Sequence, residues 1–291
     1  MEPGYDLLKH IRKRYPDLEI RSVRALDDYR QEHHVYVVNE AVVFRFPSTP
    51  RGVQALMREK FILSRIHAIL PLPVPRPLYS SSGTEQPGEV FVGYHYIEGM
   101  PLTPQRLQSS GDIQHQRRLA RQLGEFLKAL HEYPVDFIGI HLPQYERKSD
   151  WQALYQSARE QIFPLLRPEV SRRFAALFEE TLNDVPMLDF APCLTHGRLE
   201  PYNVLYDEDN RQISGVVDFS HAGVGDPAAD FAGLLVHGEE FLDWVSLSYP
   251  VPMAVHRRAQ FIHSVTPLQD AVDCLARGDQ AGFDRLVAAL R

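Results

Sequence analysis

The amino-acid sequence predicts an α+β protein with two lobes of unequal size, and two observations carry this prediction. Up to about residue 97, short strand-like runs and turns surround one long amphipathic helix. From residue 104 onward, apolar residues recur mainly at helical spacing, interrupted by a strand hairpin. We therefore expect a small N-terminal sheet lobe with one packed helix over residues 1–97, a linker over residues 98–103, and a larger, mainly helical C-terminal lobe over residues 104–291.

The first lobe is expected to contain a helix, a hairpin, a second helix and a further strand pair. Residues 5–15 form a short amphipathic pattern, and the runs 34–38 and 41–46 flank the tight turn at Asn39 and Glu40. Residues 52–70 predict the packed helix, with one apolar face made of Leu56, Phe61, Ile62, Ile66 and Ile69. After a proline-rich segment that cannot be helical, strands are expected at about 81–88 and 90–97.

The second lobe shows helical spacing in three long segments. Residues 114–132 predict one helix, and residues 155–183 predict at least two, because Pro164 and Pro168 interrupt the pattern. Residues 204–206 and 212–218 form a hairpin, and residues 228–291 are helical again. A mostly β lobe, a linker and a mainly helical lobe follow one another in the order found in kinases.

Composition excludes several classes of protein. With 291 residues, 44% of them hydrophobic, the chain can bury a large core. Cys193 and Cys274 lie far apart without metal-ligand spacing, so neither a zinc site nor a disulfide framework is expected. There is no signal-like N-terminus and no apolar run long enough for a membrane span, so we expect no membrane partner and a cytoplasmic location.

The charge of the chain also restricts its partners. The formal charge is −7, from 38 acidic and 31 basic side chains. This excess opposes non-specific binding to nucleic acid and weakly favours a cationic ligand. We therefore expect no nucleic-acid partner.

Residues 195–230 contain most of a phosphoryl-transfer motif. A kinase catalytic loop places an aspartate base five residues before an asparagine that holds magnesium, and a second metal-binding aspartate follows on the next hairpin. Asn203 and Asp218 occupy the two metal positions. The position five before Asn203 is Arg198, whose guanidinium cannot accept a proton at any ordinary pH.

Several separated segments resemble the aminoglycoside phosphotransferase family, and in detail the aminoglycoside 2″-phosphotransferases. They are VVFRFPSTPRG at 42–52, HAILPLPVPRPLY at 67–79, GYHYIEGMPLT at 93–103, CLTHGRLEPYNVLY at 193–206 and ISGVVDFSHAGVGDPAADFAGLL at 213–235. The resemblance implies a protein-kinase-like fold. It also implies transfer of the γ-phosphoryl group of ATP or GTP, with Mg²⁺, to a hydroxyl of an aminoglycoside or similar sugar-like substrate, an activity that confers antibiotic resistance.

The resemblance assigns roles in nucleotide binding. Arg45 stands where the family has a phosphate-contacting lysine, and Glu59 is its expected ion-pair partner, although the two could instead form a solvated surface pair. Tyr96 and Ile97 fall in the interlobe hinge that contacts the nucleotide. Between Val23 and Val35, the expected phosphate-covering loop has no glycine and carries acidic residues, so it should bind phosphate weakly or be a plain polar turn.

Further roles concern the catalytic loop and its surroundings. The amide of Asn203 and the carboxylate of Asp218 suit Mg²⁺, while His196 is expected to brace the loop rather than to exchange protons. Asp226 and Asp230 are expected to cap the following helix and to hold the loop.

Arg198 removes the expected base, whose contribution to rate is typically about 10²–10⁴. Its charge is expected near Asp218 and the γ-phosphate, where it could neutralise the metal site or grip the phosphate. It should also repel a cationic amino sugar. Glu200 is the nearby carboxylate that could substitute as base.

The acceptor is expected to be a small cationic or sugar-like molecule. Glu239, Glu240 and Asp243 are candidate acceptor carboxylates, or simply a solvated helix face. Two functions follow from the sequence: a phosphotransferase impaired by loss of its base, or a pseudokinase that binds nucleotide or ligand without turnover.

Overall fold

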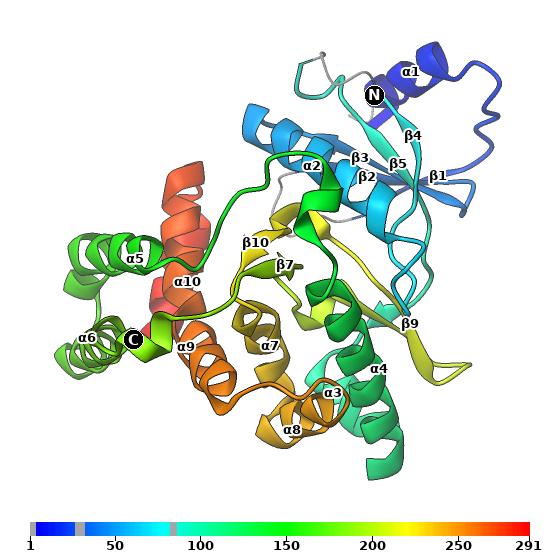
Figure 1. Ribbon diagram of the computed structural model, residues 1–291. Helices are drawn as coiled ribbons and strands as arrows, with labels where there is room; N and C mark the ends of the chain where they lie inside the picture. Colours follow the sequence, from blue (N-terminus) through cyan, green and yellow to red (C-terminus); the bar gives the residue numbers. More distant parts are fainter. Residues whose placement is uncertain (1–3, 27–32, 82–85) are drawn as a thin grey trace.

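A computed structural model describes residues 4–26, 33–81 and 86–291. Figure 1 shows a sheet flanked by helices at the upper right and a larger group of helices at the left and below. This arrangement confirms the predicted α+β fold with two lobes.

An antiparallel five-stranded sheet forms the first lobe in the order β1-β2-β3-β5-β4. The predicted central hairpin is confirmed, and its turn residues Asn39 and Glu40 have φ angles of 55° and 49°. Both therefore lie in the left-handed region that such a turn requires, which matches the twist of the flanking strands. The strands are β1 Val23–Leu26, β2 His33–Val38, β3 Val42–Pro47, β4 Pro77–Ser80 and β5 Val92–His95.

Side chains of β3 alternate between the two faces of this sheet, as the period of two requires. Phe44 and Phe46 face α1 (Gly4–Arg14) and share a buried cluster with its Leu8 and Ile11. Arg45 points to the opposite face, toward α2 (Pro50–Ile66). The helix expected at residues 5–15 therefore packs on the sheet as well, because α1 covers the face that α2 leaves open.

Two details of the first lobe differ from the sequence prediction. The second helix ends at Ile66 rather than residue 70, and Phe61 and Ile69 are 38% and 53% exposed instead of buried. Strand β4 lies at Pro77–Ser80, before the predicted span of 81–88, of which residues 82–85 are outside the described residues. A strand can begin at Pro77 because β4 is an edge strand, where a missing N–H costs no ladder bond.

Eight helices build the second lobe in the part of the chain that the structure describes. The predicted interruption at Pro164 and Pro168 is confirmed, since it separates α5 from α6. No helix among the described residues combines the length and hydrophobicity needed to cross a bilayer. The helices are α3 Pro104–Ser109, α4 Ile113–His131, α5 Lys148–Gln161, α6 Pro168–Asn183, α7 Ala228–Leu234, α8 Glu239–Ser248, α9 Met253–Arg277 and α10 Gln280–Leu290.

Two small sheets connect the lobes and frame the catalytic loop, residues 196–203. After β5 the chain forms β6 (Met100–Pro101), which pairs with the predicted hairpin of β8 (Val204–Asp207) and β9 (Gln212–Val216). The loop itself lies between β7 (Cys193–Thr195) and β8, and β7 pairs with β10 (Gly223–Gly225).

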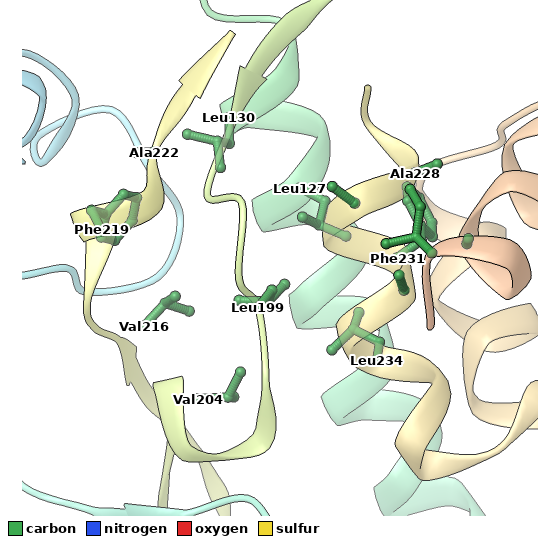
Figure 2. Packing of buried hydrophobic residues seen from close by; sticks show 14 of the residues in the cluster. Leu127, Leu130, Leu199, Val204, Val216, Phe219, Ala222, Ala228, Phe231 and Leu234 are labelled. Carbon is green, nitrogen blue, oxygen red and sulfur yellow. The ribbon is translucent and has the colours of Figure 1, made fainter. Parts of the chain in front are cut away.

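Leu199 anchors the catalytic loop in the core. Its side chain is fully buried, and Figure 2 shows it between Val204 and Val216 of the hairpin on one side and α4 and α7 on the other. Since the apolar side chain is held from both sides, the neighbouring polar residues of the loop are presented at fixed positions.

Gly233 of α7 should be irreplaceable because it touches the backbone of this loop. A Cβ at this position would lie 2.7 Å from the carbonyl carbon of Leu199 and nearer still to its oxygen. Although alanine has the higher helix propensity by about 1 kcal/mol, we expect Gly233→Ala to lower the free energy of unfolding by about 1–3 kcal/mol through overpacking. Urea denaturation measures this. Ala176→Gly, at an exposed position of α6, is the control that measures the difference in helix propensity between alanine and glycine without overpacking. An unchanged or raised stability of Gly233→Ala would contradict the prediction.

Candidate functional site

A cavity of about 820 Å³ lies between the two lobes. Its walls come from strands β2 and β3, from the hinge residues Tyr96 and Ile97, and from Asn203 and Asp218 of the second lobe. The structure thus brings together all the residues that the sequence assigns to nucleotide and metal binding, because Arg45 and Glu59 also line it. The expected phosphate-covering loop joins β1 to β2, and its residues 27–32 are outside the described residues.

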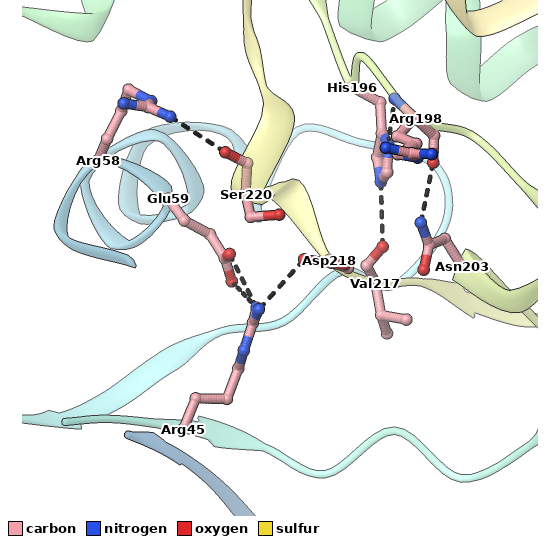
Figure 3. Close-up of polar contacts among 9 residues, drawn as sticks. All are labelled: Arg45, Arg58, Glu59, His196, Arg198, Asn203, Val217, Asp218 and Ser220. Carbon is pink, nitrogen blue, oxygen red and sulfur yellow. Dashed lines mark hydrogen bonds and ion pairs between the residues drawn. The ribbon is translucent and has the colours of Figure 1, made fainter. Parts of the chain in front are cut away.

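Arg45 pairs with one carboxylate of each lobe (Figure 3). Its Nη1 donates to both oxygens of Glu59 at 2.8 Å, and its Nη2 donates to Oδ1 of Asp218 at 3.2 Å. Glu59 is only 1% exposed, so the alternative of a solvated surface pair was wrong. One guanidinium therefore joins the neighbouring elements β3 and α2 to the end of the β9 hairpin, which is 173 residues further along the chain.

Burial and charge oppose each other in this ion cluster. Burial alone would lower the pKa of Arg45, but the charges of Glu59 and Asp218 outweigh it and raise that pKa, which keeps the guanidinium charged. Burial raises the pKa of Glu59, and the charge of Arg45 counteracts this shift. A buried pair of this kind depends on both members, since removing one leaves an uncompensated charge.

Asn203 and Asp218 have the chemistry of a magnesium site. The Nδ2 of Asn203 donates to the backbone carbonyl of Arg198 at 2.9 Å, and a carbonyl can only accept, so Oδ1 must be the amide atom turned away from the loop. Asp218 follows β9 with φ 65°, a left-handed conformation that turns its carboxylate into the cavity. Among the described residues there is no cluster of three or more His, Cys, Asp and Glu side chains that could hold a metal. A cation here would thus need oxygens of its substrate, as magnesium usually does.

His196 and Asp230 hold the catalytic loop in shape. The Asp230 carboxylate accepts the backbone N–H groups of His196 at 2.9 Å and Gly197 at 2.8 Å, and it contacts Nε2 of His131 on α4 at 3.0 Å. The His196 ring is fully buried, and its Nε2 lies 3.0 Å from the carbonyl oxygen of Val217 (Figure 3). Both residues therefore make the bracing contacts expected of them.

Asp226 also makes the expected capping contact. Its Oδ1 accepts the backbone N–H of Ala228 at 2.9 Å, at the start of α7, and its carboxylate is paired with Arg258 of α9.

Arg198 does not reach toward Asp218, contrary to the expectation from the sequence. Its Nε donates to Glu200 at 2.8 Å, and its Nη2 pairs with Asp270 of α9. Burial would lower the pKa of Arg198, but these two carboxylates raise it, so it stays charged. Arg45, rather than Arg198, supplies the cation at Asp218. Asp270 was missed in the sequence, where only its spacing from Asp273 on one helix face offered a signal.

A second cavity of about 500 Å³ lies on the other side of the catalytic loop. The loop, α7 and α9 form its walls, together with Glu146 and Trp151. Glu200 and Tyr202 line both cavities, so the two spaces meet at these residues. Glu146, in a loop without any motif, was missed in the sequence.

The structure places the predicted acceptor carboxylates elsewhere. Glu239, Glu240 and Asp243 lie on an exposed part of α8 and are not among the described residues that line the second cavity. Glu239 instead accepts a hydrogen bond from Gln260 at 3.0 Å. The sequence pattern identified a helix face, but the helix presents that face to solvent.

Comparison with known proteins agrees with this geometry. The sequence profile of the phosphotransferase enzyme family matches residues 24–250 of this chain. The chain belongs to this family. Viomycin phosphotransferase of Streptomyces vinaceus is 29% identical to it over 262 residues, and the match covers 86% of each chain.

Solved structures of other phosphotransferases are similar over almost the whole chain. An aminoglycoside 2″-phosphotransferase in complex with GDP and kanamycin superimposes with a TM-score of 0.88 at 25% identity, covering 99% of this chain and 97% of that one. Macrolide 2′-phosphotransferase type I, at 20% identity, has a TM-score of 0.76 over 100% and 97% of the two chains, and shows the fold alone. These similarities confirm the kinase-like fold and the predicted family resemblance.

The ion pair of this phosphotransferase should contribute strongly to its stability. We expect Glu59→Gln to lower the free energy of unfolding by about 3 kcal/mol, because it leaves the buried Arg45 with Asp218 as its remaining carboxylate. Chemical denaturation measures this. Glu40→Gln is the matched control, since it breaks the exposed pair of Glu40 with Arg24 in the same lobe and should leave the midpoint nearly unchanged. Equal effects of the two substitutions would contradict the prediction.

Proposed function

We propose that this chain is a phosphotransferase that moves the γ-phosphoryl group of ATP or GTP to a hydroxyl of an aminoglycoside or a similar cationic, sugar-like molecule. The observation that carries the proposal is the meeting of two cavities at Glu200 and Tyr202 of the catalytic loop. One cavity holds the phosphate-binding and metal-binding residue types, and the other is open for an acceptor. A phosphoryl group would pass between them at the loop.

The relatives support both substrates. One similar structure contains GDP and kanamycin together, and the relative from Streptomyces vinaceus is named for viomycin. In the interlobe cavity, Tyr96 and Ile97 of the hinge and Val35 and Val43 of the sheet would enclose the base. Arg45 would face the phosphates from the floor of the same cavity.

Asn203 and Asp218 would hold magnesium between the phosphates and the loop. The turned Oδ1 of Asn203 and the carboxylate of Asp218 fit an ion that prefers oxygen ligands. When bound, the ion would neutralise charge on the phosphates. Asp218 would then interact with both the ion and Arg45. Arg45 would keep its second ion pair, with Glu59.

The chain has no carboxylate at position 198, so we assign to Glu200 the role of accepting the proton of the acceptor hydroxyl. This side chain lies at the junction of the cavities and is held by Nε of Arg198 at 2.8 Å. In the transfer step the acceptor oxygen forms the new P–O bond, the bond from the γ-phosphorus to the leaving nucleoside diphosphate breaks, and the hydroxyl proton passes to Glu200. Most of the catalysis in such transfers comes from positioning and electrostatics, which this loop still provides.

The alternative is a pseudokinase, and the pairing of Arg198 favours it. Glu200 is paired with Arg198, so binding of nucleotide without turnover would follow if this ion pair keeps the carboxylate from taking the hydroxyl proton. Because ATP and GTP are cytoplasmic metabolites, we also propose a cytoplasmic location. Phosphorylation of an antibiotic hydroxyl there would give its host antibiotic resistance.

The experiment that tests the function measures nucleotide binding and turnover separately. Calorimetric titration with MgATP and MgGTP should show binding. A coupled assay over kanamycin, viomycin, a macrolide and glucose should show nucleoside diphosphate release with a cationic acceptor. Binding without release on any acceptor would establish the pseudokinase, above all if Arg198→Asp restored turnover. Absence of nucleotide binding would reject both functions.

Glu200 should act in the transfer step and not in nucleotide binding. We expect Glu200→Gln to lower kcat about 100-fold, within the usual range for loss of a general base, with the Kd for MgATP unchanged. Glu208→Gln is the control, because Glu208 lies on the β8–β9 turn and pairs only peripherally with Arg106 at 2.8 Å. An unchanged kcat in Glu200→Gln would remove Glu200 from the mechanism.

A further inference from the structure

Glu146 is a carboxylate built into the wall of the second cavity. The segment before it runs along β10, where the Tyr145 N–H donates to the Val224 carbonyl at 3.0 Å. At Glu146 the backbone takes a left-handed conformation with φ 58°, which is uncommon for a residue with a side chain. Its carbonyl accepts the indole N–H of Trp151 at 3.1 Å, so the position is held from both sides.

The carboxylate of Glu146 has one hydrogen-bond donor among the described residues. Its Oε2 accepts the backbone N–H of Asp226 at 3.3 Å, in space that is open because residue 225 is glycine. Its Oε1 accepts from none of the described donors. A half-buried carboxylate with a single neutral donor loses part of its solvation, and such groups concentrate at binding and catalytic sites.

The charged groups around Glu146 do not compensate it. Asp150 of α5, together with Asp226 and Asp230 at the start of α7, adds negative charge beside it. Asp226 and Asp230 have partners of their own, since Arg258 of α9 pairs with Asp226 and His131 of α4 contacts Asp230.

No lysine or arginine among the described residues that line the second cavity is left to pair with Glu146. Of the described residues that line this cavity, Glu200 is the only other carboxylate, and it is paired with Arg198, the only lysine or arginine of the lining. His221 and His263 are the lining histidines, and Nδ1 of His263 contacts the carbonyl of Ala232 at 3.0 Å.

We propose that Glu146 binds a primary ammonium group of the acceptor, a cation that the described lysines and arginines of the cavity wall do not supply. This inference rests on the proposed function, because it names what the acceptor must carry besides its reacting hydroxyl. The hydroxyl would lie at the Glu200 end of the cavity and the ammonium group against the wall of Glu146 and Trp151. The apolar face of Trp151 would shield this ion pair from water and so strengthen it.

Binding of an ammonium ion at this wall should release a proton. Burial, reinforced by the neighbouring acids, raises the pKa of Glu146 to about 8, so the free protein holds it mostly protonated at pH 7. An ammonium ion favours the ionised form and drives the proton off. Neutral acceptors would not do so.

Isothermal titration calorimetry at pH 7, in two buffers of different ionisation enthalpy, measures the number of protons released on binding and so tests the proposed ammonium site. The probes are kanamycin, viomycin, spermidine and, as a neutral counterpart, kanamycin acetylated on all its amines. Wild-type protein should release up to about one proton more than Glu146→Gln on binding a cationic probe, and the variant should bind it about 10- to 100-fold more weakly. The acetylated probe should bind both proteins equally.

Two controls separate the site from the fold. Glu180→Gln, on an exposed part of α6, should match wild type with every probe. The thermal unfolding midpoint of each protein is measured as a function of pH to show that the variants are folded. Because the pKa of Glu146 is raised from 4.5 to about 8, wild type should lose stability relative to Glu146→Gln as the pH rises from about 5 to about 9. Glu146→Asp replaces the glutamine variant if that one does not fold.

The outcomes are distinct. Equal affinity and equal proton release by wild type and Glu146→Gln would overturn the ammonium site, and so would failure of every cationic probe to bind a wild-type protein that binds MgATP. If MgATP does not bind either, the proposed function fails as a whole. Reduced affinity of the variant for the acetylated probe as well would assign Glu146 a structural role and overturn the site.

Discussion

The contact on which the site depends is the ion cluster of Arg45 with Glu59 and Asp218. It joins a strand and a helix of the first lobe to a hairpin of the second, and its members are 14 and 173 residues apart in the chain. Charges buried to this degree are stable only with their partners in place. The relative position of the lobes is therefore coupled to the charge state of the cavity between them, and a nucleotide phosphate or a metal ion entering there changes the balance of the same cluster.

The backbone of the catalytic loop is held by contacts that do not involve the side chain at position 198. Asp230 accepts two loop N–H groups, and Asn203 donates to the carbonyl of residue 198. Leu199 is embedded between the β8–β9 hairpin on one side and α4 and α7 on the other. This explains how the loop keeps its shape with an arginine where the kinase motif has an aspartate. The arginine is accommodated because α9 provides Asp270 and the loop provides Glu200.

The two cavities present different charged side chains to their proposed ligands. In the interlobe cavity the phosphates would meet Arg45, while in the second cavity the acceptor would meet Glu146 and the paired Glu200. Arg198 lies beside the second cavity, but its charge is balanced by two carboxylates and so repels a cationic acceptor less than an isolated arginine would. The electrostatic effect of a substitution thus depends on the partners that fold around it.

The sequence by itself determined the features that arise from neighbouring residues. Alternation along β3, the Asn39–Glu40 turn, the breaks at Pro164 and Pro168 and the spacing of the catalytic loop all act within a few residues. The elements, and the positions of Asn203 and Asp218 on them, could therefore be predicted. Only the tertiary structure decided where Arg198 points, because Asp270 lies 72 residues further along the chain. It also decided that Glu146, and not the acidic face of α8, lines the second cavity. A carboxylate has the same local pattern whether it faces solvent or a cavity, and only the packing of distant elements separates the two.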